Sequence, residues 1–145
     1  MSHKPTLILV PGAWHGPNTW DKVTALLEAQ QYKCITVDLP SANSDPSATL
    51  LDDVNAVRGP IVTETEQGRD VVVVVHSYGG FVGPSAIKGL TRPKDGSSSK
   101  TQSGHVIGLA YISSGFAPTG VAFLEALGGN HRRSGRSMSR VGSPS

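Results

Sequence analysis

The sequence contains little cysteine, few aromatic residues and no long hydrophobic run. Its single cysteine, Cys34, excludes an internal disulfide and a paired-cysteine metal site, and it is typical of a reducing compartment. The first apolar run, residues 6–10, is interrupted by Pro11 and Gly12, so it is too short for a signal-peptide core, and no segment is long enough to span a membrane. We therefore expect a cytoplasmic protein with no membrane association, no metal site and no cofactor.

Acidic residues are absent from the last part of the chain. All 11 of them lie at or before Glu125, whereas four of the 13 basic residues follow it. Residues 1–130 thus have a net charge of −2 and residues 131–145 a net charge of +4. The first part has no basic stripe and the second has no aromatic side chain for stacking, so we expect no nucleic-acid partner. We expect one core over residues 1–130 and a disordered Ser/Arg/Gly-rich tail after it, because such a composition cannot bury enough apolar area to fold.

Apolar segments alternate with helical patterns along the chain. Residues 47–58 have apolar positions at helical spacing (Leu50, Leu51, Val54 and Val57); we expect this helix to stop at Gly59, and a second short helix to start at Pro60. Strands that are apolar on both faces are typical of a parallel sheet with helices on both sides, so the pattern predicts an α/β fold of about four strands. The segments expected as strands are residues 6–10, 33–39, 70–77 and 105–114.

The third expected strand runs directly into a serine and two glycines. A serine on a tight strand-to-helix turn presents its hydroxyl at the edge of the sheet, and the positions two before and two after it are usually small, because strand and helix pass closely there. Gly79 satisfies this pattern around Ser77, whereas Val75 departs from it. The N–H groups of the following helix would favour the negative charge that develops in acyl transfer. Ser77 is therefore our candidate nucleophile.

A Gly/Pro-rich loop, residues 11–16, follows the first expected strand. The carboxyl ends of parallel strands share one edge of the sheet, so we expect this loop to meet Ser77 there. An oxyanion hole needs the backbone N–H of the residue after the nucleophile and one from such a loop, which indicates Tyr78 and, in preference to Trp14, Ala13. The residues expected to line the pocket beside them are Trp14, His15 and Gly79.

Three segments carry a resemblance to a known family. The stretches LVPGAWHGPNTW, VVVVVHSYGG and VIGLAYISSGFAP resemble α/β-hydrolases of the AB hydrolase-1 type, in the compact group that includes plant methylesterases and hydroxynitrile lyases, and most of all its fungal members. The resemblance extends over residues 5 to about 130. It implies a partial α/β-hydrolase fold, a serine hydrolase with Ser77 as nucleophile and Ala13 and Tyr78 as oxyanion donors, and small esters or related acyl or cyanohydrin compounds as substrates.

The acid and the histidine of a catalytic triad are missing from their expected places. In this family they follow the serine, in the order acid and then histidine. The resemblance implies that they come from strands beyond residue 130, so we expect a C-terminally truncated member whose apolar fourth strand is left at a sheet edge and promotes self-association. The residues after Ser77 that have suitable side chains, none at the required position, are Asp95, His105, Glu125 and His131.

Three functional hypotheses remain open at this stage. The first is a serine hydrolase lineage that acts on ester bonds through Ser77. The second is a catalytically dead fragment that retains the pocket as a binding or regulatory module. The third is a dyad of Ser77 with His15, which lies in the oxyanion loop.

Overall fold

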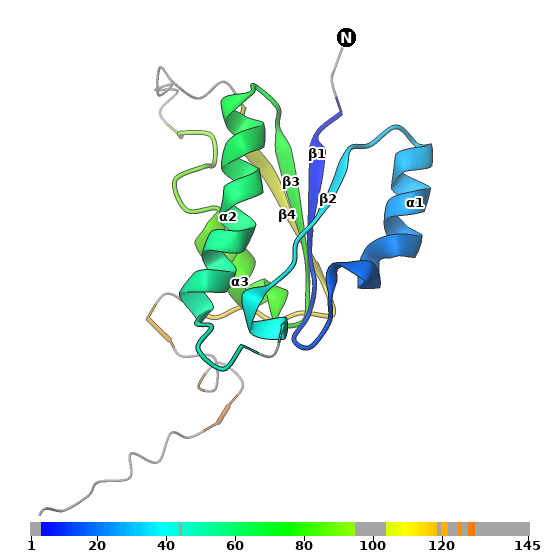
Figure 1. Cartoon of the computed structure of the whole chain (residues 1–145). Helices are drawn as coiled ribbons and strands as arrows, with labels where there is room; N and C mark the ends of the chain where they lie inside the picture. Colours follow the sequence, from blue (N-terminus) through cyan, green and yellow to red (C-terminus); the bar gives the residue numbers. More distant parts are fainter. Residues whose placement is uncertain are drawn as a thin grey trace, which may run out of the picture.

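The protein is built around a four-stranded parallel sheet. The computed structural model describes residues 4–43, 45–94, 104–118, 120–121, 125 and 128–129. The strand order is β2-β1-β3-β4, and all three neighbouring pairs are parallel (Figure 1). This confirms the predicted fold class. The strands are β1 (Thr6–Val10), β2 (Cys34–Thr36), β3 (Val71–His76) and β4 (Val106–Ile112).

Helices cover both faces of the sheet, as predicted. Helix α1 (Asp21–Ala29) lies on one side, and α2 (Leu50–Glu66) and α3 (Gly79–Ala86) lie together on the other (Figure 1). Two short 3-10 helices, η1 (Pro17–Trp20) and η2 (Pro40–Ala42), follow β1 and β2 on the chain. None of the described helices is both long and apolar enough to cross a bilayer.

The valines of β3 are buried unequally on the two faces. Val71, Val73 and Val75 are fully buried in the core that α2 and α3 complete, whereas Val72 and Val74 on the opposite face are only half-buried. The apolar pattern on both faces did not distinguish them; the face with Val72 and Val74 is covered less completely because α1 contacts chiefly the β2 side of the sheet. On β4, Ile107 and Ile112 are exposed.

Helix α2 continues through Pro60, so the prediction of a break at Gly59 and a second helix was wrong. A proline inside a helix loses one backbone hydrogen bond and usually kinks or ends the helix. Here Val57 and Ile61, on either side of the proline, are both fully buried against the sheet, and their burial favours one continuous helix.

The buried face of α2 also differs from the predicted one. Leu50 and Leu51 are 50% and 65% exposed, although helical spacing had placed them on the apolar face. The buried positions instead include two acidic residues at the same helical period as the apolar ones, and they are Asp53, Val57, Ile61 and Glu64. Each buried carboxylate is paired with polar groups from other segments, which is why it can be tolerated there.

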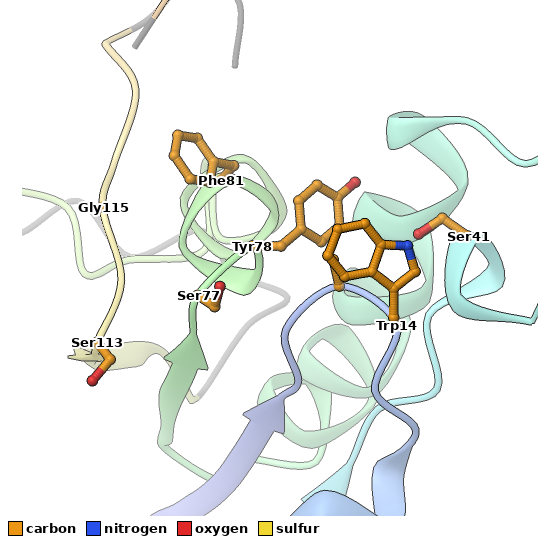
Figure 2. A pocket seen from close by; sticks show the side chains of 8 residues that line it. Trp14, Ser41, Ser77, Tyr78, Phe81, Ser113 and Gly115 are labelled. Carbon is orange, nitrogen blue, oxygen red and sulfur yellow. The ribbon is translucent and has the colours of Figure 1, made fainter. Parts of the chain in front are cut away.

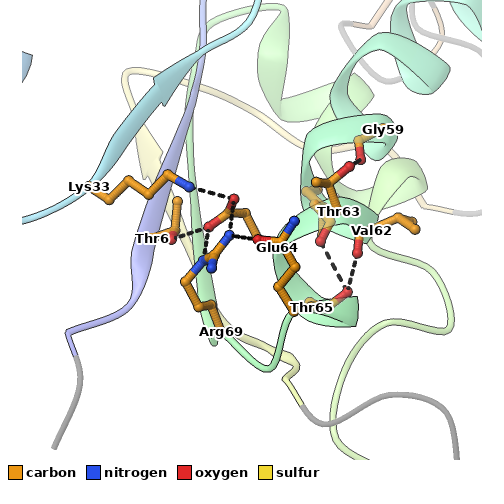
Figure 3. Close-up of polar contacts among 10 residues, drawn as sticks. Thr6, Lys33, Gly59, Val62, Thr63, Glu64, Thr65 and Arg69 are labelled. Atoms are coloured by element: carbon orange, nitrogen blue, oxygen red, sulfur yellow. Dashed lines mark hydrogen bonds and ion pairs between the residues drawn. The ribbon is translucent and has the colours of Figure 1, made fainter.

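Glu64 joins the amino ends of the first three strands (Figure 3). Its Oε2 accepts hydrogen bonds from Thr6 Oγ1 at 2.6 Å and from Arg69 Nε at 2.5 Å, and its Oε1 accepts from Lys33 Nζ at 2.7 Å. Thr6 begins β1, and the two cations precede β2 and β3. Arg69 and then Lys33 and Thr6 hold the pKa of Glu64 down, at about 2 despite its burial.

Several expectations fall on residues outside the described ones. They include the tail over residues 131–145 and most of residues 119–130 before it. The candidate triad residues Asp95 and His131 also lie outside the described residues.

Candidate functional site

Ser77 occupies a strained turn between β3 and α3. Its backbone φ is 50°, a left-handed conformation that is uncommon for a residue with a side chain and that recurs at functional sites. Gly79 lies so close in space to the end of β1 that a Cβ on it would be 3.0 Å from the carbonyl oxygens of Val10 and Pro11. The turn thus has the tight strand-to-helix geometry that the sequence predicted for Ser77.

Val75, the residue that departs from the small-residue pattern, is accommodated by a different glycine. Val75 is fully buried, and its Cγ1 lies 2.7 Å from where a Cβ of Gly83 would stand. Gly83 is in the second turn of α3, so the helix can approach β3 despite the larger side chain. The pairing of these two positions could not be inferred from spacing around Ser77 alone.

The carbonyl group of Ser77 is held by two donors. The backbone N–H of Gly80 donates to it at 3.1 Å, and Ser114 Oγ, from the segment after β4, donates to it at 2.6 Å. Gly80 is necessary for this contact, because a Cβ there would lie 1.9 Å from Ser114 Oγ. The turn is therefore fixed by three segments: β1, the start of α3 and the end of β4.

The loop after β1 reaches Ser77, as predicted. A Cβ at Gly12 would stand 3.1 Å from the Cβ of Ser77 and 3.1 Å from the His76 ring. Trp14 in this loop has a φ of 61° and a side chain that is 91% exposed. Its indole ring stands near Tyr78 and Ser41 (Figure 2).

A cavity of about 550 Å³ lies in front of Ser77 (Figure 2). Its size is that of a site for a small molecule, and its wall is mostly apolar with a few hydroxyl groups. Four residues expected at the site line it: Ala13, Trp14, Ser77 and Tyr78. The sequence reasoning did not identify the other four, which are Ser41, Phe81, Ser113 and Gly115.

His15 and Gly79 do not line this cavity, although both were expected to. Gly79 packs against the carbonyl oxygens at the end of β1, which leaves it behind the turn. His15 donates from Nδ1 to the carbonyl oxygen of Ala13 at 2.8 Å, and its ring lies edge-on to that of His76, 6.4 Å away between centroids. No hydrogen bond joins a histidine or carboxylate to the hydroxyl of Ser77 among the described residues.

Tyr78 links the site to the interior of the protein. Its hydroxyl donates to Asp53 Oδ2 at 2.8 Å, and Ser41 donates to the same carboxylate from its backbone N–H at 3.0 Å and from Oγ at 2.6 Å. Burial and then the neighbouring Asp53 carboxylate raise the pKa of the Tyr78 phenol above its ordinary value, so it remains protonated at neutral pH. The sequence analysis did not identify Asp53, because its partners Ser41 and Tyr78 are distant in sequence.

Asp38 is an acceptor that fixes the loop after β2, since Asn43 Nδ2 donates to its Oδ2 at 3.0 Å. Within the described part of the chain, no three side chains of histidine, cysteine, aspartate or glutamate come together as a metal site. The arrangement around Ser77 offers a hydroxyl on a strained turn, neighbouring backbone N–H groups and an apolar cavity. This combination suits a small molecule that carries a carbonyl group.

Comparison with known proteins gives a consistent family. The model of the Alpha/beta hydrolase family matches residues 7–143. The chain is 42% identical over 90 residues to alpha/beta hydrolase nvfD of Aspergillus novofumigatus, which covers 61% of this chain and 36% of that protein. It is 33% identical over 79 residues to methyl jasmonate esterase 1 of Vitis vinifera, covering 50% of this chain and 30% of the esterase.

A solved structure shares the fold. It is an extracellular alpha/beta-hydrolase from a Paenibacillus species, described as sharing structural and functional homology with tobacco salicylic acid binding protein 2. The likeness has a TM-score of 0.59 at 18% sequence identity and covers 79% of this chain and 42% of that one. Of the two curated relatives named above, the chain spans about a third of the length.

Proposed function

The chain belongs to the alpha/beta hydrolase family. We propose that it derives from serine hydrolases that act on small-molecule esters, with Ser77 as the nucleophile. The observation that carries this proposal is the left-handed turn at Ser77, with a φ of 50°, at the mouth of an apolar cavity. The similarity to a methyl jasmonate esterase supports an ester as the substrate class. Ala13 and Tyr78 both line the cavity. Their backbone N–H groups are the proposed oxyanion donors.

The proposed reaction proceeds through a covalent acyl intermediate. Ser77 Oγ attacks the ester carbonyl carbon and passes its proton to a general base, and the negative charge on the carbonyl oxygen is held by the two backbone N–H groups. The bond to the alcohol oxygen then breaks, and the alcohol leaves with the proton. Water attacks the acyl group in the same way, which releases the carboxylic acid and restores the Ser77 hydroxyl.

The rate at which this chain can perform the reaction depends on whether a general base is available to Ser77. Loss of the base in a well-studied serine protease lowers turnover about a millionfold. Among the described residues, His15 does not line the cavity and forms no hydrogen bond with Ser77, and this favours a different source for the base over the Ser77–His15 dyad. It also motivates the alternative function, a fragment that binds ester-like molecules in the cavity without turning them over.

A fluorophosphonate probe tests the proposal, because it phosphonylates only an activated serine. We expect the purified chain to be labelled on Ser77, identified by mass spectrometry of the modified peptide. Ser77→Ala should remove the label. Ser113→Ala is the matched control, since Ser113 lines the same cavity and also has a positive φ, of 44°, and this variant should keep the label.

Folded protein that stays unlabelled would reject the activated nucleophile and favour the binding fragment. Titration with a methyl ester, followed by tryptophan fluorescence, would then detect the binding, because Trp14 stands at the cavity. Trp14→Phe is the control that assigns the signal, since the other tryptophan, Trp20, is buried in the core.

We also propose that the isolated chain self-associates through β4. Among the described residues, Val106 at the start of β4 forms a bridge with Thr91, and no strand pairs with the outer side of the rest of β4. The strand has no charged residue or proline along its length. An apolar edge without such residues favours pairing with a second copy. Analytical ultracentrifugation should show oligomers that Ile107→Lys converts to monomers, whereas Leu26→Lys, on the exposed side of α1, should leave them unchanged. A monodisperse wild-type monomer would contradict this expectation.

A further inference from the structure

Asp53 is a buried carboxylate within the candidate site that the proposed mechanism does not use. It is fully buried in the first turns of α2, where an unpaired charge would be strongly unfavourable. Its two oxygens accept three hydrogen bonds, all of them from Ser41 and Tyr78. Hydrogen bonds to a carboxylate are stronger than neutral ones, so this group holds both partners firmly.

The two partners belong to different walls of the cavity. Ser41 lies in η2, which follows β2, and Tyr78 precedes α3 immediately after Ser77. Both residues line the cavity, and Figure 2 shows their side chains on the side of Ser77 where the Trp14 ring stands. Asp53 itself does not line it. One carboxylate on α2 therefore connects two segments that line the site.

We propose that Asp53 is a positioning residue, which fixes the Tyr78 backbone beside Ser77 and holds the Ser41 wall at a set distance from it. The catalytic part of this inference rests on the proposed function, in which the Tyr78 N–H binds the oxyanion. Oxyanion donors stabilise a transition state best when they are already in place, since no reorganisation is then needed during the reaction. The phenol of Tyr78 serves as the anchor, and its backbone N–H does the binding.

Saturation kinetics of fluorophosphonate labelling test the catalytic part. Asp53→Asn keeps the shape of the side chain and removes its charge, while Tyr78→Phe removes the phenol hydroxyl and keeps the backbone N–H. We expect each to lower the maximal labelling rate constant about tenfold and to change the half-saturating probe concentration little, because a misplaced donor affects the transition state. The double variant should be no slower than either single variant, because Asp53 acts through Tyr78.

The neighbouring acidic residue supplies the matched control. Asp52 is exposed and forms the capping box of α2 with Thr49, so Asp52→Asn weakens the helix start without touching the cavity. It should leave the labelling kinetics unchanged. Rate losses of Asp53→Asn and Tyr78→Phe that multiply in the double variant would overturn action through Tyr78.

Hydrogen exchange tests the same inference without any catalysis. In Asp53→Asn, amides in residues 39–43 and 78–81 should exchange faster together, while those of β1 and β3 keep their protection; Asp52→Asn should show no such change. Unchanged or globally raised exchange in Asp53→Asn would overturn the positioning role. If wild-type protein is not labelled on Ser77, the proposed function fails, and the exchange experiment still decides whether Asp53 holds the two walls.

Discussion

Glu64→Gln is expected to destabilise the protein by about 3 kcal/mol, because the buried side chain loses its charge-assisted hydrogen bonds with Lys33 and Arg69. The Glu64 side chain is 3% exposed, whereas those of Lys33 and Arg69 are 53% and 37% exposed. The two cations can therefore turn towards water, which keeps the loss at the lower end for such pairs. Urea unfolding at neutral pH measures the effect. Glu66→Gln, an exposed position on the same helix, is the control and should unfold like the wild type.

The same carboxylate makes stability depend on pH in the acid range. The pKa of Glu64 is lowered from an ordinary 4.5 to about 2 in the folded protein, chiefly by Arg69. Its contribution is therefore fully present above pH 4.5 and is lost as the pH falls towards 2. The difference in unfolding free energy between wild type and Glu64→Gln should shrink over this range. A difference that stays constant from pH 5 to pH 2 would refute the assignment.

Gly80→Ala is expected to damage both stability and the site. A Cβ at this position would stand 1.9 Å from Ser114 Oγ and 2.3 Å from the carbonyl oxygen of Gly115, and the second atom belongs to the backbone. The segment after β4 must therefore move away, which removes the Ser114 hydrogen bond to the Ser77 carbonyl and shifts the cavity wall at Gly115. We expect a loss of about 1–3 kcal/mol from overpacking, and slower labelling of Ser77.

A second helical glycine provides the control for this substitution. Gly59 lies within α2, and a Cβ there would meet nothing within 4 Å. Gly59→Ala should therefore change stability by less than about 1 kcal/mol, because the higher helix propensity of alanine is offset by contact of its Cβ with the ring of Pro60, which follows it. Thermal unfolding of both variants compares them directly. A Gly80→Ala protein with wild-type stability and wild-type labelling would show that the Ser114 contact does not hold the turn.

The prediction of α2 illustrates how far sequence patterns extend. Apolar spacing placed Leu50 and Leu51 in the core, yet both are largely exposed, whereas Asp53 and Glu64 are buried. A pattern that counts only apolar residues cannot find a buried carboxylate, because its hydrogen-bond partners come from distant segments: Ser41 and Tyr78 for Asp53, and Thr6, Lys33 and Arg69 for Glu64.

The cavity lining also consists of residues that the sequence predicted and residues that it did not. Ala13, Trp14, Ser77 and Tyr78 were identified from two loops that follow strands, since parallel topology brings such loops to one edge. Ser41, Phe81 and Gly115 have no local signature. They join the cavity only because η2, α3 and the end of β4 converge on the same edge of the sheet.

The sequence by itself determined the elements and their order: four apolar strands, the helices between them, a parallel sheet covered on both faces and a serine on a strand-to-helix turn. These follow from periodicity and turn residues, which are local properties of the chain. Only the tertiary structure decided that α2 runs through Pro60, that Gly83 makes room for Val75, and that Asp53 connects two walls of the site. The reason is that burial and hydrogen-bond pairing depend on residues distant in sequence, and these can override local preference.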